Sequence, residues 1–127
     1  MNPALLHALL ESAFRAAPPM LASERDLQDS VERALVAERV IYDREHRLDA
    51  KSRPDFFVEG PVLGRGIAVE VKIADSLSSL TRQLFRYADH PAVTGILVVT
   101  TLHRLRRLPP TMCGRPVVVL DVGDYLL

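Results

Sequence analysis

Apolar and polar residues alternate along residues 67–73, and this pattern predicts a β-strand with two unlike faces. One face carries every second residue and is apolar: Ile67, Val69, Val71 and Ile73. The opposite face carries Glu70 and Lys72, whose side chains project about 6 to 7 Å apart at the usual rise of a strand. Both charges can therefore address one bound water.

The segment before this strand follows the same alternation and predicts its hairpin partner. Phe56 and Val58 match the apolar face, so Asp55 falls on the side of Glu70. The residues between the two strands are turn formers: Gly60, Pro61, Gly64 and Gly66. Residues 54–73 are thus predicted to form a hairpin that brings three ionisable side chains to one side.

Apolar residues at helical spacing predict three helices. The first covers residues 3–17 and stops at a pair of prolines. The second begins after Ser23, a good N-cap, and runs to about Glu38. The third begins after Ser76, another N-cap, and ends near His90.

The remaining segments predict three further strands. Residues 40–46 are expected to form a strand, followed by a polar connection over residues 47–53. Residues 95–100 and 116–121 are nearly continuous apolar runs, which suit strands covered on both faces. The order is helix, helix, three strands, helix, strand, strand, and the predicted class is α/β.

Size and composition predict one small domain with a real core. The chain has 127 residues, of which 48% are hydrophobic and 25% charged. The net charge is zero, which argues against binding nucleic acid by charge alone. Residues 1–75 carry ten basic and thirteen acidic residues, whereas residues 76–127 carry six and three. An acidic site beside a basic C-terminal surface is therefore expected.

Two features favour a cytoplasmic protein without a membrane partner. Cys113 is the only cysteine, so no intrachain disulfide and no cysteine-based metal site can form. The apolar stretch over residues 3–17 lacks an initial basic cluster and is too short and too charged to span a bilayer.

The charged face of the hairpin predicts a metal-dependent phosphodiesterase site. Carboxylates on adjacent strands suit Mg²⁺ or Mn²⁺, so Asp55 and Glu70 are candidate ligands, and the backbone carbonyl of Val71 can add another. Lys72 is expected to orient an attacking water or to stabilise developing charge. The chain has fourteen arginines and only two lysines, so a lysine inside an apolar strand is unlike the rest of its basic residues. The alternative is a solvated face of an edge strand.

Pro54-Asp55 followed by Glu70-Val71-Lys72 resembles the PD-(D/E)xK nuclease superfamily, whose fold is that of restriction endonucleases. The resemblance implies an αβββαβ core with a mixed central sheet flanked by helices over residues 23–127, and residues 1–22 as an accessory N-terminal helix. Within that superfamily, the chain resembles small Holliday-junction resolvases and nucleases of phages or mobile elements. The resemblance also implies a divalent metal and hydrolysis of nucleic acid.

That family often places another acid on the helix before the strands, and Glu24 is the candidate metal ligand there, with Glu32 as the fallback. A glutamate in a first helical turn also stabilises the helix dipole, so both readings of Glu24 stay open. The segment over residues 82–87 resembles the glutamine-bearing helix of several branches, and Gln83 is expected to bind the attacking water or a phosphate. An ordinary polar helix face is the alternative.

Basic residues supply candidate contacts to a phosphate backbone. The segment over residues 103–107 is expected to be an exposed, mobile loop whose arginines fit phosphates, although a merely solvated loop explains it equally well. The candidate nucleic-acid contacts are Arg53, Arg86, Arg104, Arg106 and Arg107.

Two hypotheses of different classes follow. The leading one is a Mg²⁺-dependent nuclease, an endonuclease acting on DNA as a homodimer, with RNA left open as a substrate. The alternative is a catalytically silent module of the same fold that binds nucleic acid or a protein partner in a mobile-element or defence system.

Overall fold

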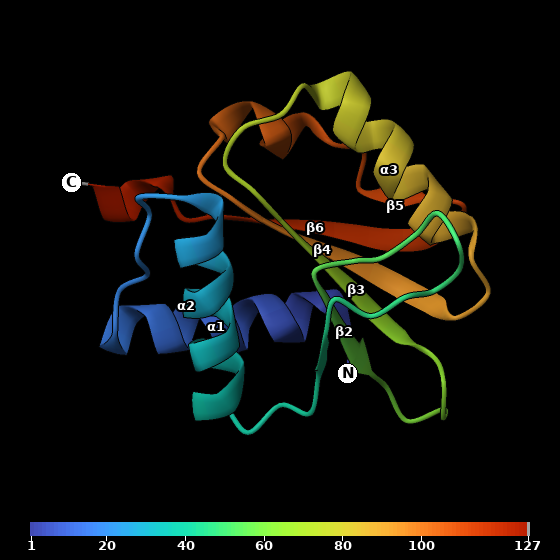
Figure 1. The fold of residues 1–127 in the computed structure, drawn as a ribbon, viewed down its shortest axis with the longest axis horizontal. Coiled ribbons are helices and arrows are strands. Elements are labelled where there is room, and N and C mark those ends of the chain that lie inside the picture. The colour runs from blue at the N-terminus through green and yellow to red at the C-terminus, as the bar shows by residue number, and fades with distance from the viewer. Residues whose placement is uncertain (127) are drawn as a thin grey trace.

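Six strands form one open, mixed sheet in the computed structural model, which describes residues 1–126 (Figure 1). The strands are β1 (Asp43–Arg44), β2 (Phe56–Glu59), β3 (Gly66–Lys72), β4 (Val93–Thr100), β5 (Thr111–Met112) and β6 (Arg115–Asp121). The helices are α1 (Pro3–Ala16), α2 (Glu24–Ala37) and α3 (Leu77–Asp89), with two short 3₁₀ helices, η1 (His103–Arg107) and η2 (Gly123–Leu126). The predicted α/β class is confirmed.

The centre of the sheet is parallel and its borders are antiparallel. The strand order is β1-β2-β3-β4-β6-β5, and β3, β4 and β6 run parallel to one another. Their register aligns Lys72 with Thr100 and Thr100 with Asp121. Because parallel strands end at the same edge, the last residues of all three meet there, and this edge carries the chemistry described below.

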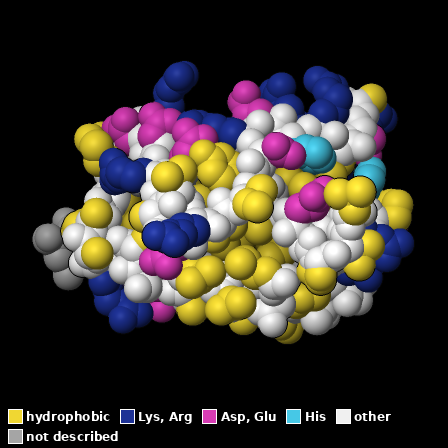
Figure 2. Space-filling model, turned by 90° about the horizontal axis from the view of Figure 1, so that it is seen from below, with side chains coloured by type: hydrophobic (Ala, Val, Ile, Leu, Met, Phe, Trp, Pro, Cys, Tyr) yellow, Lys and Arg dark blue, Asp and Glu magenta, His cyan; other side chains and the backbone are white. Residues whose placement is uncertain are grey.

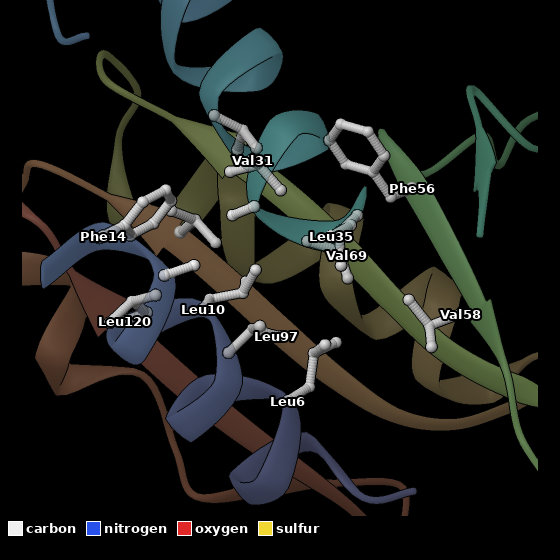
Figure 3. Close-up of a cluster of buried hydrophobic side chains, with 14 of the residues drawn as sticks. Leu6, Leu10, Phe14, Val31, Leu35, Phe56, Val58, Val69, Leu97 and Leu120 are labelled. Atoms are coloured by element: carbon white, nitrogen blue, oxygen red, sulfur yellow. The ribbon is translucent and has the colours of Figure 1, made fainter. Parts of the chain in front are cut away.

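Helices cover both faces of the sheet, with α1 and α2 on one side and α3 on the other (Figure 1). The side chains of alternate strand positions enter two separate apolar clusters. Figure 3 shows the first cluster, where α1 and α2 meet β2, β3, β4 and β6; its labelled members are Leu6, Leu10, Phe14, Val31, Leu35, Phe56, Val58, Val69, Leu97 and Leu120. The predicted coverage of both faces of the apolar strands is confirmed.

Helix caps explain where the second and third helices begin. The Ser23 hydroxyl accepts a hydrogen bond from the Asp26 amide at 3.0 Å, and the Ser76 hydroxyl accepts one from the Ser79 amide at 3.0 Å. The helix bounds confirm the sequence prediction for both. The helix predicted to be accessory, α1, buries Leu6 and Leu10 completely in the first cluster and so shares the core of the sheet.

The hairpin over residues 54–73 is confirmed. β2 and β3 pair antiparallel, with Phe56 opposite Val69. Gly66 opens β3 where a side chain would collide with the partner strand, because a Cβ built there would lie 2.1 Å from the Val58 carbonyl oxygen. The glycine therefore permits the close approach of the two strands.

Two predictions outside the central strands were wrong, and one strand was missed. The strand expected over residues 40–46 shrinks to β1, because Ile41 is 85% exposed and Glu45 has a φ of 54°, which ends the extended backbone. The expected mobile loop over residues 103–107 is the helix η1, because Leu105 is fully buried in the second cluster. The strand β5 was not predicted.

Among residues 1–126, no helix is both long enough and apolar enough to cross a bilayer. Figure 2 shows the molecule from below the view of Figure 1: apolar side chains occupy much of the middle of this face, and charged side chains gather mainly along its upper edge.

Candidate functional site

The three hairpin residues singled out by the sequence come together near the C-terminal end of β3. The Lys72 Nζ lies 3.4 Å from Glu70 Oε2, and Asp55 Oδ2 accepts a hydrogen bond from the Val71 amide at 2.7 Å. Asp55 immediately precedes β2, and its charge acts to raise the pKa of both Glu70 and Lys72. Two carboxylates and one ammonium thus share one small region.

Asp55 is held through both carboxylate oxygens. The Val71 amide donates to Oδ2, and the Gln28 side-chain amide of α2 donates to Oδ1 at 3.2 Å. Burial raises the pKa of Asp55, while the Val71 hydrogen bond and the charge of Lys72 lower it, and the net direction is upward. The carboxylate is therefore fixed in place and incompletely compensated.

Glu70 is the most perturbed carboxyl of the site. Its side chain is 3% exposed. Burial, together with the charge of Asp55, raises the pKa of Glu70 to about 7, although Lys72 and Tyr87 act in the opposite direction. Near neutral pH, the protonation of Glu70 therefore depends on the charges that lie or bind beside it.

Lys72 is half-buried and stays charged. Burial lowers the pKa of its ammonium, but the nearby carboxylates Glu70 and Glu24 more than offset this, and the net direction is upward. Its Nζ also lies 3.9 Å from Asp75 Oδ2. An ammonium with 18% of its side chain exposed can meet an incoming anion without leaving its carboxylate.

Helix α3 presents two polar side chains to Glu70. The Gln83 amide donates to Glu70 Oε2 at 3.2 Å and to the Tyr87 hydroxyl at 3.0 Å, and that hydroxyl donates to Glu70 Oε1 at 3.0 Å. Burial and the charge of Glu70 both raise the pKa of Tyr87, so the phenol stays protonated and donates. Gln83 was predicted to face the site, whereas Tyr87 was missed, although its position four residues after Gln83 placed it on the same helix face.

The two candidate acids of α2 have different surroundings. Glu24 Oε1 accepts a hydrogen bond from the Ile73 amide at 3.4 Å, at the end of β3, and its charge acts on Asp55 and Lys72. Glu32 instead pairs with Arg44 at 3.2 Å. Glu24 therefore lies beside the site, and its role as a metal ligand, like that of the Val71 carbonyl, stays a prediction.

The predicted basic residues are distributed unevenly. Arg104 donates to the Asp75 carbonyl at 2.5 Å, which ties η1 to the loop after Lys72. Arg106 Nε lies 2.9 Å from Asp121 Oδ2 and is engaged there, and Arg107 is exposed. Arg53 is also exposed, two residues before Asp55.

Arg86 belongs to another part of the surface. It lines a hollow of about 340 Å³ between α3 and the loop before β2. The other lining residues are Asp49, Ala50, Lys51, Ser52 and Asp89. Two acids in this lining make Arg86 a weaker candidate for phosphate than the arginines of η1.

The donor set fits a hard divalent cation of the Mg²⁺ type. Such an ion needs only one or two protein carboxylates, since waters and substrate phosphates complete its shell. Burial and, after it, the charge of Asp55 raise the pKa of Glu70, and a cation bound at the two carboxylates would relieve the repulsion between them. Over residues 1–126, no three His, Cys, Asp or Glu side chains are arranged so that they alone could hold a metal.

Comparisons of this chain with protein-family models, curated proteins and solved structures gave no match. The proposed function therefore rests on the geometry of the site.

Proposed function

We propose that this chain is a divalent-metal-dependent nuclease with a restriction-endonuclease-like core, acting on DNA as a homodimer. The observation that carries the proposal is the meeting of Asp55, Glu70 and Lys72 at the end of β3. The element order from α2 through β4, with β2 and β3 as a hairpin beside parallel β4, agrees with the αβββαβ core that the sequence resemblance implies.

Asp55 and Glu70 are the residues proposed to hold the metal, with Glu24 and the Val71 carbonyl as further candidates. A bound Mg²⁺ would polarise the scissile phosphate and lower the pKa of a bound water. The protein's own part is to keep both carboxylates in place: the Val71 amide fixes Asp55, and Gln83 with Tyr87 fixes Glu70. In this arrangement Gln83 acts by orienting Glu70.

Lys72 is proposed to contact the reacting phosphate group. Its ammonium stays protonated beside Glu70 and keeps part of its surface open to solvent. A fixed positive charge next to a phosphate stabilises the negative charge that develops on the phosphate oxygens in the transition state.

The substrate backbone is proposed to run along η1. The register of β3, β4 and β6 ends all three strands at one edge, and η1 follows β4 at that edge. Arg104 contacts the loop after Lys72, and Arg107 is exposed beside it. Arginine forks on η1 would bind phosphates flanking the cut.

The test is a cleavage assay with a lysine control. Lys72→Ala should reduce Mg²⁺- or Mn²⁺-dependent cleavage by about 10³-fold or more, as expected when a charge that stabilises the transition state is lost. Lys51→Ala removes the other lysine, which is exposed outside the site, and should cut like the wild type. The substrates are duplex, single-stranded, flap and junction DNA, together with RNA. Equal behaviour of wild type and Lys72→Ala on all of them would refute the proposal.

A catalytically silent module is the second candidate, and one observation favours it. Both oxygens of Glu70 already accept hydrogen bonds from Gln83 and Tyr87, as a purely structural carboxylate would. Calorimetric titration with Mn²⁺ separates the two candidates. A nuclease site should bind the ion and lose it in Asp55→Asn, whereas a silent module should bind nucleic acid or protein without it.

A further inference from the structure

A chain of side-chain hydrogen bonds leads from the edge of the sheet to Asp55. Arg44 Nη2 donates to Gln28 Oε1 at 3.4 Å, and Gln28 Nε2 donates to Asp55 Oδ1 at 3.2 Å. The three residues come from β1, α2 and the start of the hairpin. None of the motifs that predicted the site includes Arg44 or Gln28.

The direction of this chain follows from the chemistry of its members. A guanidinium has only donors and an ionised carboxylate has only acceptors, whereas an amide has one end of each kind. With Arg44 on one side and Asp55 on the other, Gln28 satisfies both only when its oxygen faces Arg44 and its nitrogen faces Asp55. Arg44 and Asp55 thus favour the same orientation of the amide, and Arg44 holds its oxygen end in place. If Arg44 were lost, the oxygen end of the amide would lose its anchor and the side chain would be less firmly held at Asp55.

Arg44 is itself held from several directions. Its Nη1 lies 2.8 Å from Asp29 Oδ1 and 3.2 Å from Glu32 Oε1, both on α2. Its guanidinium carbon lies 5.6 Å from the centre of the Phe56 ring, and its backbone pairs with Phe56 across β1 and β2. These contacts keep the guanidinium from turning away from Gln28.

The charge of Arg44 is already balanced by these two acids. The charges that act most strongly on Asp55 are instead those of Lys72, Glu24 and Glu45. The influence of Arg44 on Asp55 therefore passes through the Gln28 amide that it holds and not through direct attraction.

We propose that Arg44 and Gln28 are positioning residues for cation binding, in which Arg44 anchors the Gln28 amide and Gln28 fixes Asp55 Oδ1. The cation-binding part of this inference rests on the proposed function. With the Val71 amide on Oδ2, each oxygen of Asp55 then has one permanent donor and keeps free lone pairs for a cation. Partners of this kind, which hold a ligating carboxylate, change metal affinity by about 10- to 100-fold when removed.

The first measurement is Mn²⁺ affinity by calorimetry on the full chain. Gln28→Leu and Arg44→Leu should each weaken binding by about tenfold or more. Because the two residues act in series, the double variant should bind no more weakly than the worse single variant. Arg44→Lys keeps a donor-only group and should recover most of the affinity. Arg33→Leu removes an exposed arginine of the same helix and should bind like the wild type.

The second measurement needs no metal. The Gln28 side-chain amide signals in a nitrogen-15 NMR spectrum should show one bonded proton in the wild type and should move toward free-amide positions in Asp55→Ala and in Arg44→Leu. If Arg44→Leu does not fold, Arg44→Gln replaces it, since a glutamine there can accept as well as donate.

The outcomes separate this inference from the proposed function. If the wild type binds no Mn²⁺ but the amide signals respond as described, the positioning of Asp55 stands and the metal-dependent function falls. If the Gln28 signals ignore both substitutions, or if the losses of Mn²⁺ affinity add up fully, the positioning role is overturned even where the metal binds.

Discussion

Glu70 and Asp121 are two buried carboxylates near the same edge of the sheet, and their electrostatics are opposite. Their side chains are 3% and 4% exposed. Burial raises the pKa of each, yet the net pKa of Glu70 rises to about 7, whereas that of Asp121 falls below its usual value. Burial alone therefore does not identify a reactive carboxyl group; the partners decide.

The partners of Asp121 more than offset the effect of its burial on its pKa. The Gly123 amide donates to Oδ1 at 2.8 Å, while Arg106 and the His103 ring contact Oδ2. Burial acts to raise the pKa of Asp121, these contacts act to lower it, and the net pKa is below its usual value. Asp121 fastens η1 to the end of β6, which is a structural role.

The partners of Glu70 leave its charge under-compensated. Gln83 and Tyr87 are neutral donors, and the ammonium of Lys72 is also drawn toward Asp75 and Glu24. The charge of Asp55 adds repulsion. Of the two carboxylates, Glu70 is thus the one at which an added cation lowers the free energy more.

The largest expected effect in this comparison is on stability at Asp121. Asp121→Asn should lower the free energy of unfolding at pH 7 by about 2 to 4 kcal/mol, because Arg106 and His103 lose their buried anion. The pKa of Asp121 is depressed in the folded protein, so this contribution exists above the ordinary value of 3.8 and disappears as the pH falls through the folded value. Urea unfolding at several pH values measures it.

Cleavage by Asp121→Asn supplies the control. Per folded molecule and at saturating DNA, its cleavage rate should remain within a few-fold of the wild type, because Asp121 touches no reacting group in the proposed mechanism; the effect of loosening η1 should appear in DNA affinity. A loss of cleavage as deep as that of Lys72→Ala, with the fold intact, would place Asp121 in the site and break the contrast.

The local pattern of the sequence was sufficient to predict the hairpin and the two capped helices. Alternation over residues 67–73 fixed the faces of β3, and Ser23 and Ser76 marked helix starts through bonds to residues three positions ahead. Asp55, Glu70 and Lys72 could be grouped for the same reason, because a hairpin sets the positions of its own side chains.

Of the partners of those residues, Gln83 was predicted, whereas Gln28 and Tyr87 were not, because their contacts depend on tertiary packing. Gln28 and Asp55 are 27 residues apart, and their contact depends on how α2 crosses the sheet. The predicted loop over residues 103–107 was wrong for a similar reason: Leu105 has a buried position only after α3 and β4 have formed the second cluster. The sequence therefore located the charges but only some of the groups that tune them.

A smaller effect of opposite sign is expected at Glu70. The folded protein holds the Glu70 proton more tightly than the unfolded chain does, with a pKa of about 7 against 4.5. Its contribution to stability is therefore full below pH 4.5 and is lost as the pH rises through 7. Glu70→Gln removes this penalty and should unfold at pH 8 with a free energy about 1 to 3 kcal/mol higher than the wild type, after the loss of the Lys72 ion pair is included.

The measurement is the free energy of unfolding of Glu70→Gln and of Asp121→Asn, each compared with the wild type as a function of pH. The advantage of Glu70→Gln should vanish near pH 4, where the deficit of Asp121→Asn should still be present and should shrink only as the pH falls further. Adding Mg²⁺ at pH 8 should reduce the advantage if the ion binds beside Glu70. A Glu70→Gln variant less stable than the wild type across the whole range would mean that Lys72, Gln83 and Tyr87 compensate Glu70 as completely as Asp121 is compensated.

The smallest effect concerns Tyr87, which tunes the proton affinity of Glu70. Its hydroxyl donates to Oε1 at 3.0 Å and so lowers the pKa of Glu70. Tyr87→Phe removes one donor and leaves the ring, so the pKa of Glu70 should rise and the acidic limb of the cleavage pH profile should move to higher pH, with the plateau rate changed only a few-fold. Tyr42→Phe, a hydroxyl beside Glu32, should leave the profile where it is. Within residues 1–126, Glu70 is the one carboxylate to which the Tyr87 hydroxyl donates a hydrogen bond. If Tyr87→Phe leaves the profile unmoved, the acidic limb therefore reports the titration of a group other than Glu70.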